Sequence, residues 1–253
     1  MTRRRLDEIL AARGLYPTRA RARDAILRGT VRVDGALASK PARMVAETVQ
    51  IETADPARHY VSRAALKLEH ALKHFAIDAE GLHCLDIGAS TGGFTQVLLG
   101  HGAAHVTAID VGHDQLAAEL RGDPRLTVLE GLNARDLAAA HLAHPPDLIV
   151  CDVSFISLKL ALPPALALAA PGAHLVALIK PQFEAGREAV GKGGIVAHPA
   201  AHERVCREIV NFLEERTWPV IGVAPSPVLG GDGNREFLIA ARANHHGSGL
   251  FRT

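Results

Sequence analysis

Charged side chains stand at the ends of four apolar stretches of this sequence. Asp110 follows VTAI, Asp152 follows LIVC, Lys180 follows LVALI, and Glu236 precedes FLIA. Such stretches are typical of buried strands, and in an open α/β sheet ligands bind beyond the carboxyl ends of the strands. A lysine after five apolar residues is costly to bury unless it faces a partner. Lys180 therefore predicts chemistry at this edge; the alternative is a lysine that reaches solvent from a strand end.

A glycine-rich turn, LDIGASTGGFT at residues 85–95, joins an apolar run to a helical pattern. Its glycines let the backbone approach a ligand closely, and the following helix N-terminus presents unpaired N–H groups. The spacing matches neither the dinucleotide fingerprint G-x-G-x-x-G nor the phosphate-binding G-x-x-x-x-G-K-[ST]. The turn resembles the D-x-G-x-x-x-G-G turn of S-adenosylmethionine-dependent methyltransferases. This resemblance implies cofactor contacts from Asp86, Gly88, Ser90, Thr91, Gly92, Gly93 and Phe94.

Besides Asp152 at the end of the fourth predicted strand, two further residues are candidates for contacts with a nucleoside-type cofactor. Asp110, at the end of the second predicted strand, can accept hydrogen bonds from the ribose hydroxyls of either NAD or S-adenosyl-L-methionine. Asn133 follows the third strand, where its amide can meet an adenine edge or simply cap a helix. The turn spacing makes an NAD-dependent oxidoreductase the least favoured reading, so the expected cofactor is S-adenosyl-L-methionine.

From residue 82 onward, strand and helix patterns alternate, which predicts an α/β fold with a parallel, doubly wound sheet. The last two strands follow one another without a helix, so the final strand is expected to run antiparallel, as in Rossmann-like methyltransferases. The predicted strands are 82–87, 104–109, 126–129, 147–151, 173–179, 218–224 and 236–241, and the predicted helices are 62–75, 93–100, 113–120, 134–141, 158–169 and 198–216.

The first part of the chain differs in charge from the rest. Residues 1–63 carry 13 Lys/Arg against 7 Asp/Glu, a net charge of +6, whereas residues 64–253 carry 15 against 20, a net charge of −5. A basic segment on a mildly acidic body indicates a polyanionic partner. Few aromatic residues accompany the basic ones, so phosphate and shape contacts with structured RNA are favoured over base stacking.

Local patterns in this segment predict a small α+β domain. Helices are expected at 5–13 and 19–28, with Thr18 as the second N-cap, followed by a hairpin around Asp34-Gly35 and a strand at 48–53. The arrangement resembles the RNA-binding domain of ribosomal protein S-four. The basic residues expected to contact RNA, with a solvated surface as the alternative for each, are Arg4, Arg19, Arg23, Lys40, Arg43 and, on the following helix, Arg63.

Four residues in four different elements resemble the K-D-K-E tetrad of FtsJ-like RNA 2′-O-methyltransferases. They are Lys67 in SRAALKL, Asp152 in CDVS, Lys180 in LIKPQF and Glu236 in NREFLIA. Residues 3–242, which include most of the basic first segment, resemble the TlyA family of ribosomal-RNA cytidine-2′-O-methyltransferases, often labelled hemolysins. The resemblance implies methyl transfer from S-adenosyl-L-methionine to a cytidine 2′-hydroxyl in ribosomal RNA, with ribosomal subunits as partners.

Methyl transfer to a ribose hydroxyl needs an in-line approach and removal of the hydroxyl proton. We expect Lys180 to serve as base or alkoxide stabiliser, Asp152 to orient it, and Lys67 and Glu236 to position the substrate. To act as a base Lys180 has to be neutral; burial and the cation at Lys67 favour that form, whereas the two carboxylates oppose it.

The domain boundaries expected are an RNA-binding domain at 1–53, a linker at 54–61, a methyltransferase domain at 62–243 and a disordered tail at 244–253. Within the second domain, the glycine-rich segment 184–196 is either a mobile substrate lid or an idle surface loop.

Other functional classes find less support. Three separated cysteines, Cys84, Cys151 and Cys206, read as reduced thiols and not as a disulfide or zinc framework, so no metal is expected. No signal pattern or membrane span is expected, which favours the cytoplasm. The alternatives to an enzyme are a nonenzymatic RNA-binding or ribosome-assembly factor and a hemolysin-like membrane-active protein.

Overall fold

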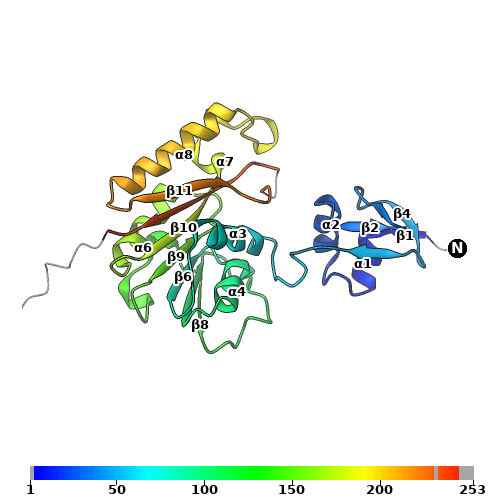
Figure 1. Cartoon of the computed structure of the whole chain (residues 1–253), viewed down its shortest axis with the longest axis horizontal. Helices are drawn as coiled ribbons and strands as arrows, with labels where there is room; N and C mark the ends of the chain where they lie inside the picture. Colours follow the sequence, from blue (N-terminus) through cyan, green and yellow to red (C-terminus); the bar gives the residue numbers. More distant parts are fainter. Residues whose placement is uncertain (1–2, 231–232, 245–253) are drawn as a thin grey trace, which may run out of the picture. The chain divides into compact units, whose positions relative to one another are not determined.

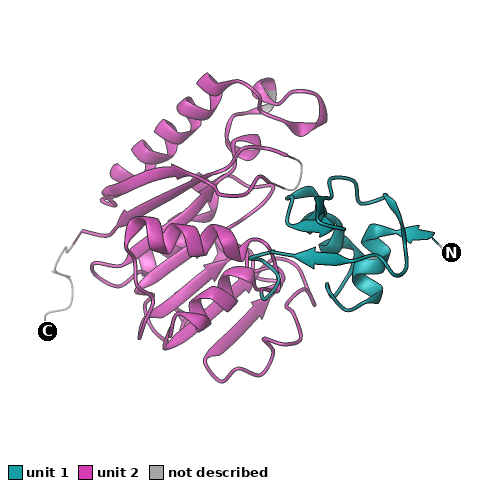
Figure 2. Cartoon of the chain, turned by 45° about the vertical axis from the view of Figure 1, so that its right-hand side comes forward, with its two compact units in different colours: residues 1–59 teal, residues 60–253 magenta. Residues whose placement is uncertain are grey.

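The computed structural model (Figure 1) describes residues 3–230 and 233–244. The chain divides into two compact units, residues 1–59 and 60–253, coloured separately in Figure 2. Of the tail predicted to be disordered, only Asn244 lies within the described residues.

Unit 2 is built on a seven-stranded sheet of order β11-β12-β10-β9-β6-β7-β8 (Figure 1). Strands β6 to β10 are parallel, whereas β12 runs antiparallel to both β10 and β11. The predicted fold class, including its antiparallel last strand, is confirmed. The strands are β6 (His83–Ile87), β7 (His105–Asp110), β8 (Leu126–Glu130), β9 (Leu148–Cys151), β10 (His174–Ile179), β11 (Val220–Pro225) and β12 (Phe237–Arg242).

Side chains of the central strands alternate between two apolar cores, one on each face of the sheet. Cys84 and Val150 pack with α3 and α4 on one face, while Leu85 and Ile149 pack with α5, α6 and α8 on the other. Because neighbouring residues of a strand point to opposite faces, strands covered on both sides are apolar throughout. These helices are α3 (Ala65–Phe75), α4 (Gly93–Gly100), α5 (Leu158–Ala161), α6 (Pro163–Leu168) and α8 (Pro199–Glu214).

Two of the predicted helices are wrong. Residues 113–120 form turns, because Asp114 has a φ of +55° and its N–H and those of the next two residues donate to the carboxylate of Glu130. Residues 134–141 form two 3-10 turns, η1 (Ala134–Asp136) and η2 (Ala139–His141), because Leu137 between them is extended. Both segments have apolar residues at helical spacing, but a residue with non-helical backbone angles interrupts each of them.

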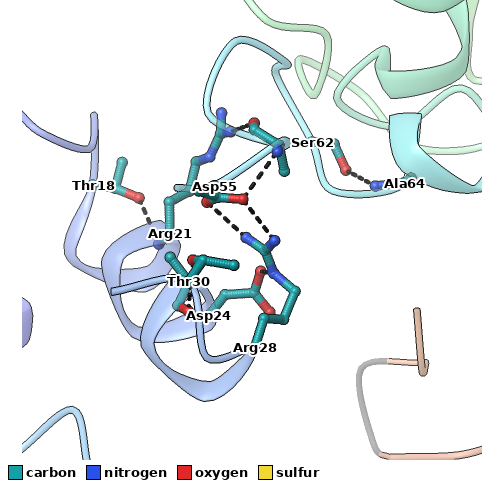
Figure 3. Close-up of polar contacts among 10 residues, drawn as sticks. Thr18, Arg21, Asp24, Arg28, Thr30, Asp55, Ser62 and Ala64 are labelled. Carbon is teal, nitrogen blue, oxygen red and sulfur yellow. Dashed lines mark hydrogen bonds and ion pairs between the residues drawn. The ribbon is translucent and has the colours of Figure 1, made fainter. Parts of the chain in front are cut away.

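Proline and a turn shift the bounds of other helices. The predicted helix 158–169 is split into α5 and α6 at Pro163, which lacks the N–H that a continuous helix needs. Helix α3 begins at Ala65, because Ser62 instead caps the turn before it by accepting from the Ala64 N–H at 3.1 Å (Figure 3). The sequence patterns did not predict the short helix α7 (Pro181–Glu184), which starts with a proline at its first position.

Unit 1 has its own apolar core under two helices and two small sheets. Thr18 caps α2 by accepting from the Arg21 N–H, and the Asp34-Gly35 turn joins β2 to β3 with positive φ at both residues, as predicted. The pairing of β1 with β4 was not predicted. The elements are β1 (Arg3–Arg5), α1 (Leu6–Ala12), α2 (Arg19–Leu27), β2 (Val31–Val33), β3 (Ala36–Leu37), β4 (Met44–Ala46) and β5 (Ile51–Thr53).

A buried ion pair fixes the end of unit 1. Asp55, whose side chain is 1% exposed, receives hydrogen bonds from both terminal nitrogens of Arg28 at 2.7 and 2.8 Å and from the Ala57 N–H at 2.9 Å (Figure 3). Arg21 adds a hydrogen bond to the Ala57 carbonyl at 2.8 Å. Burial raises the pKa of Asp55, but the bonds from Arg28 and Ala57 outweigh it, so the pKa is lowered.

We expect Asp55→Asn to weaken unit 1 by about 3 kcal/mol at pH 7, because it removes the buried anion that both terminal nitrogens of Arg28 contact and leaves this guanidinium only the less buried Asp24. Since the folded-state pKa is lowered, the wild-type advantage is present above the ordinary carboxyl pKa and is lost as the pH falls through the folded-state value. Hydrogen exchange of residues 19–33 at pH 7 measures the effect in this unit alone, and the exposed Glu52→Gln is the matched control. Equal protection in Asp55→Asn and wild type would contradict the expectation.

Candidate active site

The four residues of the predicted tetrad lie together at one edge of the sheet. Lys67 stands on α3, Asp152 follows β9, Lys180 follows β10, and Glu236 precedes β12. The Lys67 Nζ donates to Glu236 Oε2 at 2.7 Å and lies 3.7 Å from Asp152 Oδ2. The Lys180 Nζ lies 2.6 Å from Asp152 Oδ1. The four side chains form one continuous run of alternating charge.

The strand register explains this convergence. In the antiparallel pair of β10 and β12, Ile179 lies opposite Phe237, so one step further brings Lys180 opposite Glu236. In the parallel strand β9, Cys151 is the last paired residue, which places Asp152 at the same edge. Because β12 alone runs backwards, its first residue meets the ends of the parallel strands.

The tetrad is largely withdrawn from water. Lys67, Lys180 and Glu236 are 6%, 8% and 4% exposed. Charged groups at such burial are costly unless each is paired, and two cations beside two carboxylates meet that condition. Lys180 also donates to the Ser154 Oγ at 2.9 Å. The arrangement can hold a lysine amine beside a hydroxyl group of a substrate that has to lose its proton.

The glycine turn lies directly against Asp152. Gly88 has a φ of +82°, and a Cβ there would stand 2.8 Å from the Asp152 carbonyl oxygen. Gly92 has a φ of +91°, and a Cβ there would meet the side chains of Leu116 and Leu120. Both positions therefore require glycine, for backbone conformation and for space.

A cavity of about 1230 Å³ opens beside the turn and the tetrad. Five of the predicted cofactor residues line it: Gly88, Ser90, Asp110, Asn133 and Asp152. The Asp110 carboxylate accepts from the Ser90 and Gly112 N–H groups at 2.8 and 2.7 Å, one on each oxygen. A carboxylate has about four acceptor sites, so capacity remains for ligand hydroxyls. Asn133 also caps η1 through the Arg135 N–H at 3.1 Å, so both interpretations of this residue describe its surroundings.

The other predicted cofactor residues, Asp86, Thr91, Gly92, Gly93 and Phe94, do not line the cavity. Asp86 is fully buried; its Oδ2 accepts from the Thr95 Oγ1 at 2.6 Å, while its Oδ1 has no hydrogen-bond partner among the described residues. Burial raises the pKa of Asp86 to about 7. Asp86 therefore links β6 to α4 through its hydrogen bond with Thr95.

The predicted RNA-contacting residues are spread over the two units. In unit 1, Arg23, Lys40 and Arg43 are exposed. Arg4 and Arg19 are exposed as well but form ion pairs, Arg4 with Glu47 at 3.5 Å and Arg19 with Asp7 and Glu8 at 3.2 Å each. Arg63 lies in unit 2 just before α3 and is half-buried.

Sequence patterns missed three polar or strained residues at the site. Ser154 lines the cavity while holding Lys180, and Phe155 beside it is 90% exposed at a φ of +65°. The third, Asn234, is 1% exposed and bridges two loops: it accepts from the Val196 N–H at 3.0 Å and donates to the Gly194 carbonyl at 2.9 Å. The one signal available in the sequence was an asparagine two residues before Glu236.

Asn234 thus ties the glycine-rich segment 184–196 to the strand that carries Glu236. The segment contains η3 (Arg187–Ala189) and η4 (Lys192–Gly194), and two of its residues, Gly186 and Val190, line the cavity. His202 of α8 contacts it as well, through the Val196 carbonyl at 2.7 Å. The segment therefore borders the site and is anchored at its far end.

Comparisons with known proteins point in one direction. A family model described as FtsJ-like methyltransferase matches residues 60–243, and one described as S4 domain matches residues 4–51. The 16S/23S rRNA (cytidine-2'-O)-methyltransferase TlyA of Mycobacterium tuberculosis is 46% identical over 95% of this chain and 90% of its own. Hemolysin A of Brachyspira hyodysenteriae is 41% identical over 92% of this chain and 98% of its own.

Solved structures of other proteins share the fold of this chain. A protein of Streptococcus thermophilus with a provisional hemolysin designation superposes with a TM-score of 0.76 and 39% identity, covering 96% of this chain and 90% of that one. More distant methyltransferases share only the fold, and some were solved with S-adenosylmethionine or S-adenosylhomocysteine bound. No helix among the described residues is long and apolar enough to cross a membrane.

The strand order and the two family matches define a Rossmann-type methyltransferase domain, which here follows an S4 domain. The chain belongs to the FtsJ-like methyltransferase family and, within it, to the TlyA family.

We expect the stability of Asp86→Asn to gain on wild type as the pH rises. The folded-state pKa of Asp86 is raised above the unfolded value, so wild-type stability from this group is present at low pH and falls as the carboxyl is forced to ionise. The difference in free energy of unfolding should shift by roughly 3 kcal/mol in favour of the variant between pH 5 and 8. Urea denaturation across this range measures it.

The exposed Asp136→Asn on η1 is the matched control and should follow wild type. A constant difference between Asp86→Asn and wild type at every pH would mean that Asp86 does not carry the raised pKa.

Proposed function

We propose that this protein is an S-adenosyl-L-methionine-dependent methyltransferase that methylates the 2′-hydroxyl of a cytidine in ribosomal RNA. The observation that carries the proposal is the contact between Asp152 and both lysines of the tetrad, beside a cavity that Asp152 itself lines. Family membership and the activity named for the Mycobacterium tuberculosis relative support the choice of substrate.

The cavity residues suit the proposed cofactor. Gly88 leaves room where a side chain would collide with Asp152, and Asp110 keeps acceptor sites for ribose hydroxyls. Gly88, Ser90, Asp110 and Asn133 would hold the nucleoside part. When bound, the cofactor supplies an electrophilic methyl group.

The chain's own residues have to present and activate the ribose hydroxyl. Asp152 fixes the two amines with separate oxygens, Oδ1 to Lys180 and Oδ2 to Lys67. Lys180 then receives the hydroxyl proton as a base or stabilises the alkoxide as a cation, while Lys67 and Glu236 hold the ribose in line. Removal of the remaining water strengthens each of these interactions.

The RNA side of the reaction rests on unit 1. Its S4 domain and the exposed basic residues Arg23, Lys40 and Arg43 suit phosphate contacts with structured RNA. With Arg4, Arg19 and Arg63 they form the proposed RNA contacts, and ribosomal subunits are the proposed partner. The proposed compartment is the cytoplasm, because ribosomes are there.

We expect Lys180→Ala to reduce kcat by about 10²–10⁴-fold, because it removes the group that takes or stabilises the hydroxyl proton. Lys180→Arg separates the two roles, since arginine stays protonated and can stabilise an alkoxide but cannot act as a base. Transfer of tritiated methyl from S-adenosylmethionine to ribosomal subunits from cells lacking the gene measures both variants. Wild-type activity in Lys180→Ala would remove Lys180 from the mechanism.

The substrate is tested separately by mapping 2′-O-methyl groups on ribosomal RNA from cells with and without the gene. A cytidine methylated only in the presence of the gene is the expected result. Identical maps, with no transfer by the purified wild-type protein, would overturn the proposed function.

A further inference from the structure

Ser154 stands apart from the tetrad but contacts one of its members. It lies two residues after Asp152, in the loop that leaves β9, and its hydroxyl accepts a hydrogen bond from the Lys180 Nζ at 2.9 Å. The residue is exposed and lines the cavity, whereas Lys180 behind it is 8% exposed. Both contacts of Lys180, Asp152 and Ser154, therefore come from residues that line the cavity.

The two contacts of the Lys180 amine differ in kind. Asp152 Oδ1 lies 2.6 Å from the Nζ and forms an ion pair with it. Ser154 Oγ meets the hydrogen-bond angles. The attraction between two charges depends on their distance and little on direction, whereas a hydrogen bond weakens steeply when it is bent. The serine hydroxyl thus adds a directional contact to the ion pair with Asp152.

We propose that Ser154 is a positioning residue for methyl transfer, which fixes the direction of the Lys180 Nζ at the cavity where the ribose hydroxyl approaches. The inference rests on the proposed function. Lysine carries its amine on a flexible four-carbon stem, so a second contact beside the ion pair with Asp152 restricts the positions that the amine can take. Misplacement of a reacting group by about 1 Å can cost 10²-fold in rate.

A neutral acceptor suits this place better than a further carboxylate. Lys180 already faces Asp152, and another anion would add charge to a cluster in which two cations balance two carboxylates. A hydroxyl orients the amine without changing that balance, and its own proton remains free to be donated.

The test compares Ser154→Ala and Ser154→Thr in the full-length protein. With tritiated S-adenosylmethionine and ribosomal subunits from cells lacking the gene, we expect Ser154→Ala to lower kcat by about 10-fold and to leave the KM of both substrates within about twofold. Ser154→Thr, which keeps the hydroxyl, should restore most of kcat. Thr127→Ala, a hydroxyl deletion on β8 away from the cavity, is the matched control.

Each outcome has one meaning. Loss of kcat in Ser154→Ala with recovery in Ser154→Thr supports the positioning role, provided that thermal unfolding of the variants matches wild type. An unchanged kcat in Ser154→Ala, or a raised KM for the RNA alone, overturns it, since the latter indicates a substrate contact. Absence of transfer by wild type would instead count against the proposed function.

Discussion

Pairing of buried charge is the constraint on which this site depends. Two lysines and a glutamate, each less than 10% exposed, share one cluster with Asp152. An ionised group at such burial costs several kcal/mol unless it is matched, and removing one partner leaves the other uncompensated. The cluster therefore forms only when α3 and the ends of β9, β10 and β12 have reached their folded positions. The stability of the cluster and the geometry of the proposed site depend on the same three ion pairs.

The antiparallel strand β12 is what makes the cluster possible. A parallel strand at this position would start at the opposite edge, and Glu236 would lie a whole strand length from Lys180. Because β12 enters backwards, the pairing of Ile179 with Phe237 carries both charged neighbours to the same edge. Lys67 then needs to come from a helix on the face of the sheet, and α3 supplies it.

Sequence reasoning predicted the fold class because continuous apolar runs alternate with helical patterns, and Asp152, Lys180 and Glu236 stand at the ends of such runs. Lys67 lies on a helix, and only the resemblance to the K-D-K-E tetrad pointed to it. Sequence reasoning failed where a side chain's surroundings decide. Asp86 and Asp110 both stand near strand ends, but Asp86 lies one residue before the end and points into the core below α4. Ser154 follows no apolar run, and the turns at 113–120 depend on the distant Glu130. These features arise from tertiary contacts and not from local pattern.

Asp152 is the residue through which the two halves of the proposed site are coupled. Its carbonyl lies where a side chain on Gly88 would stand, its N–H donates to the Ile87 carbonyl at 3.0 Å, and its carboxylate contacts both lysines. A change in the glycine turn therefore displaces the backbone that aims the carboxylate. Since Asp152 also lines the cavity, occupation of the cavity and alignment of the lysines are linked through one short peptide segment. Ser154 lies two residues further along the same segment and also contacts Lys180, so this segment holds the lysine amine at two points.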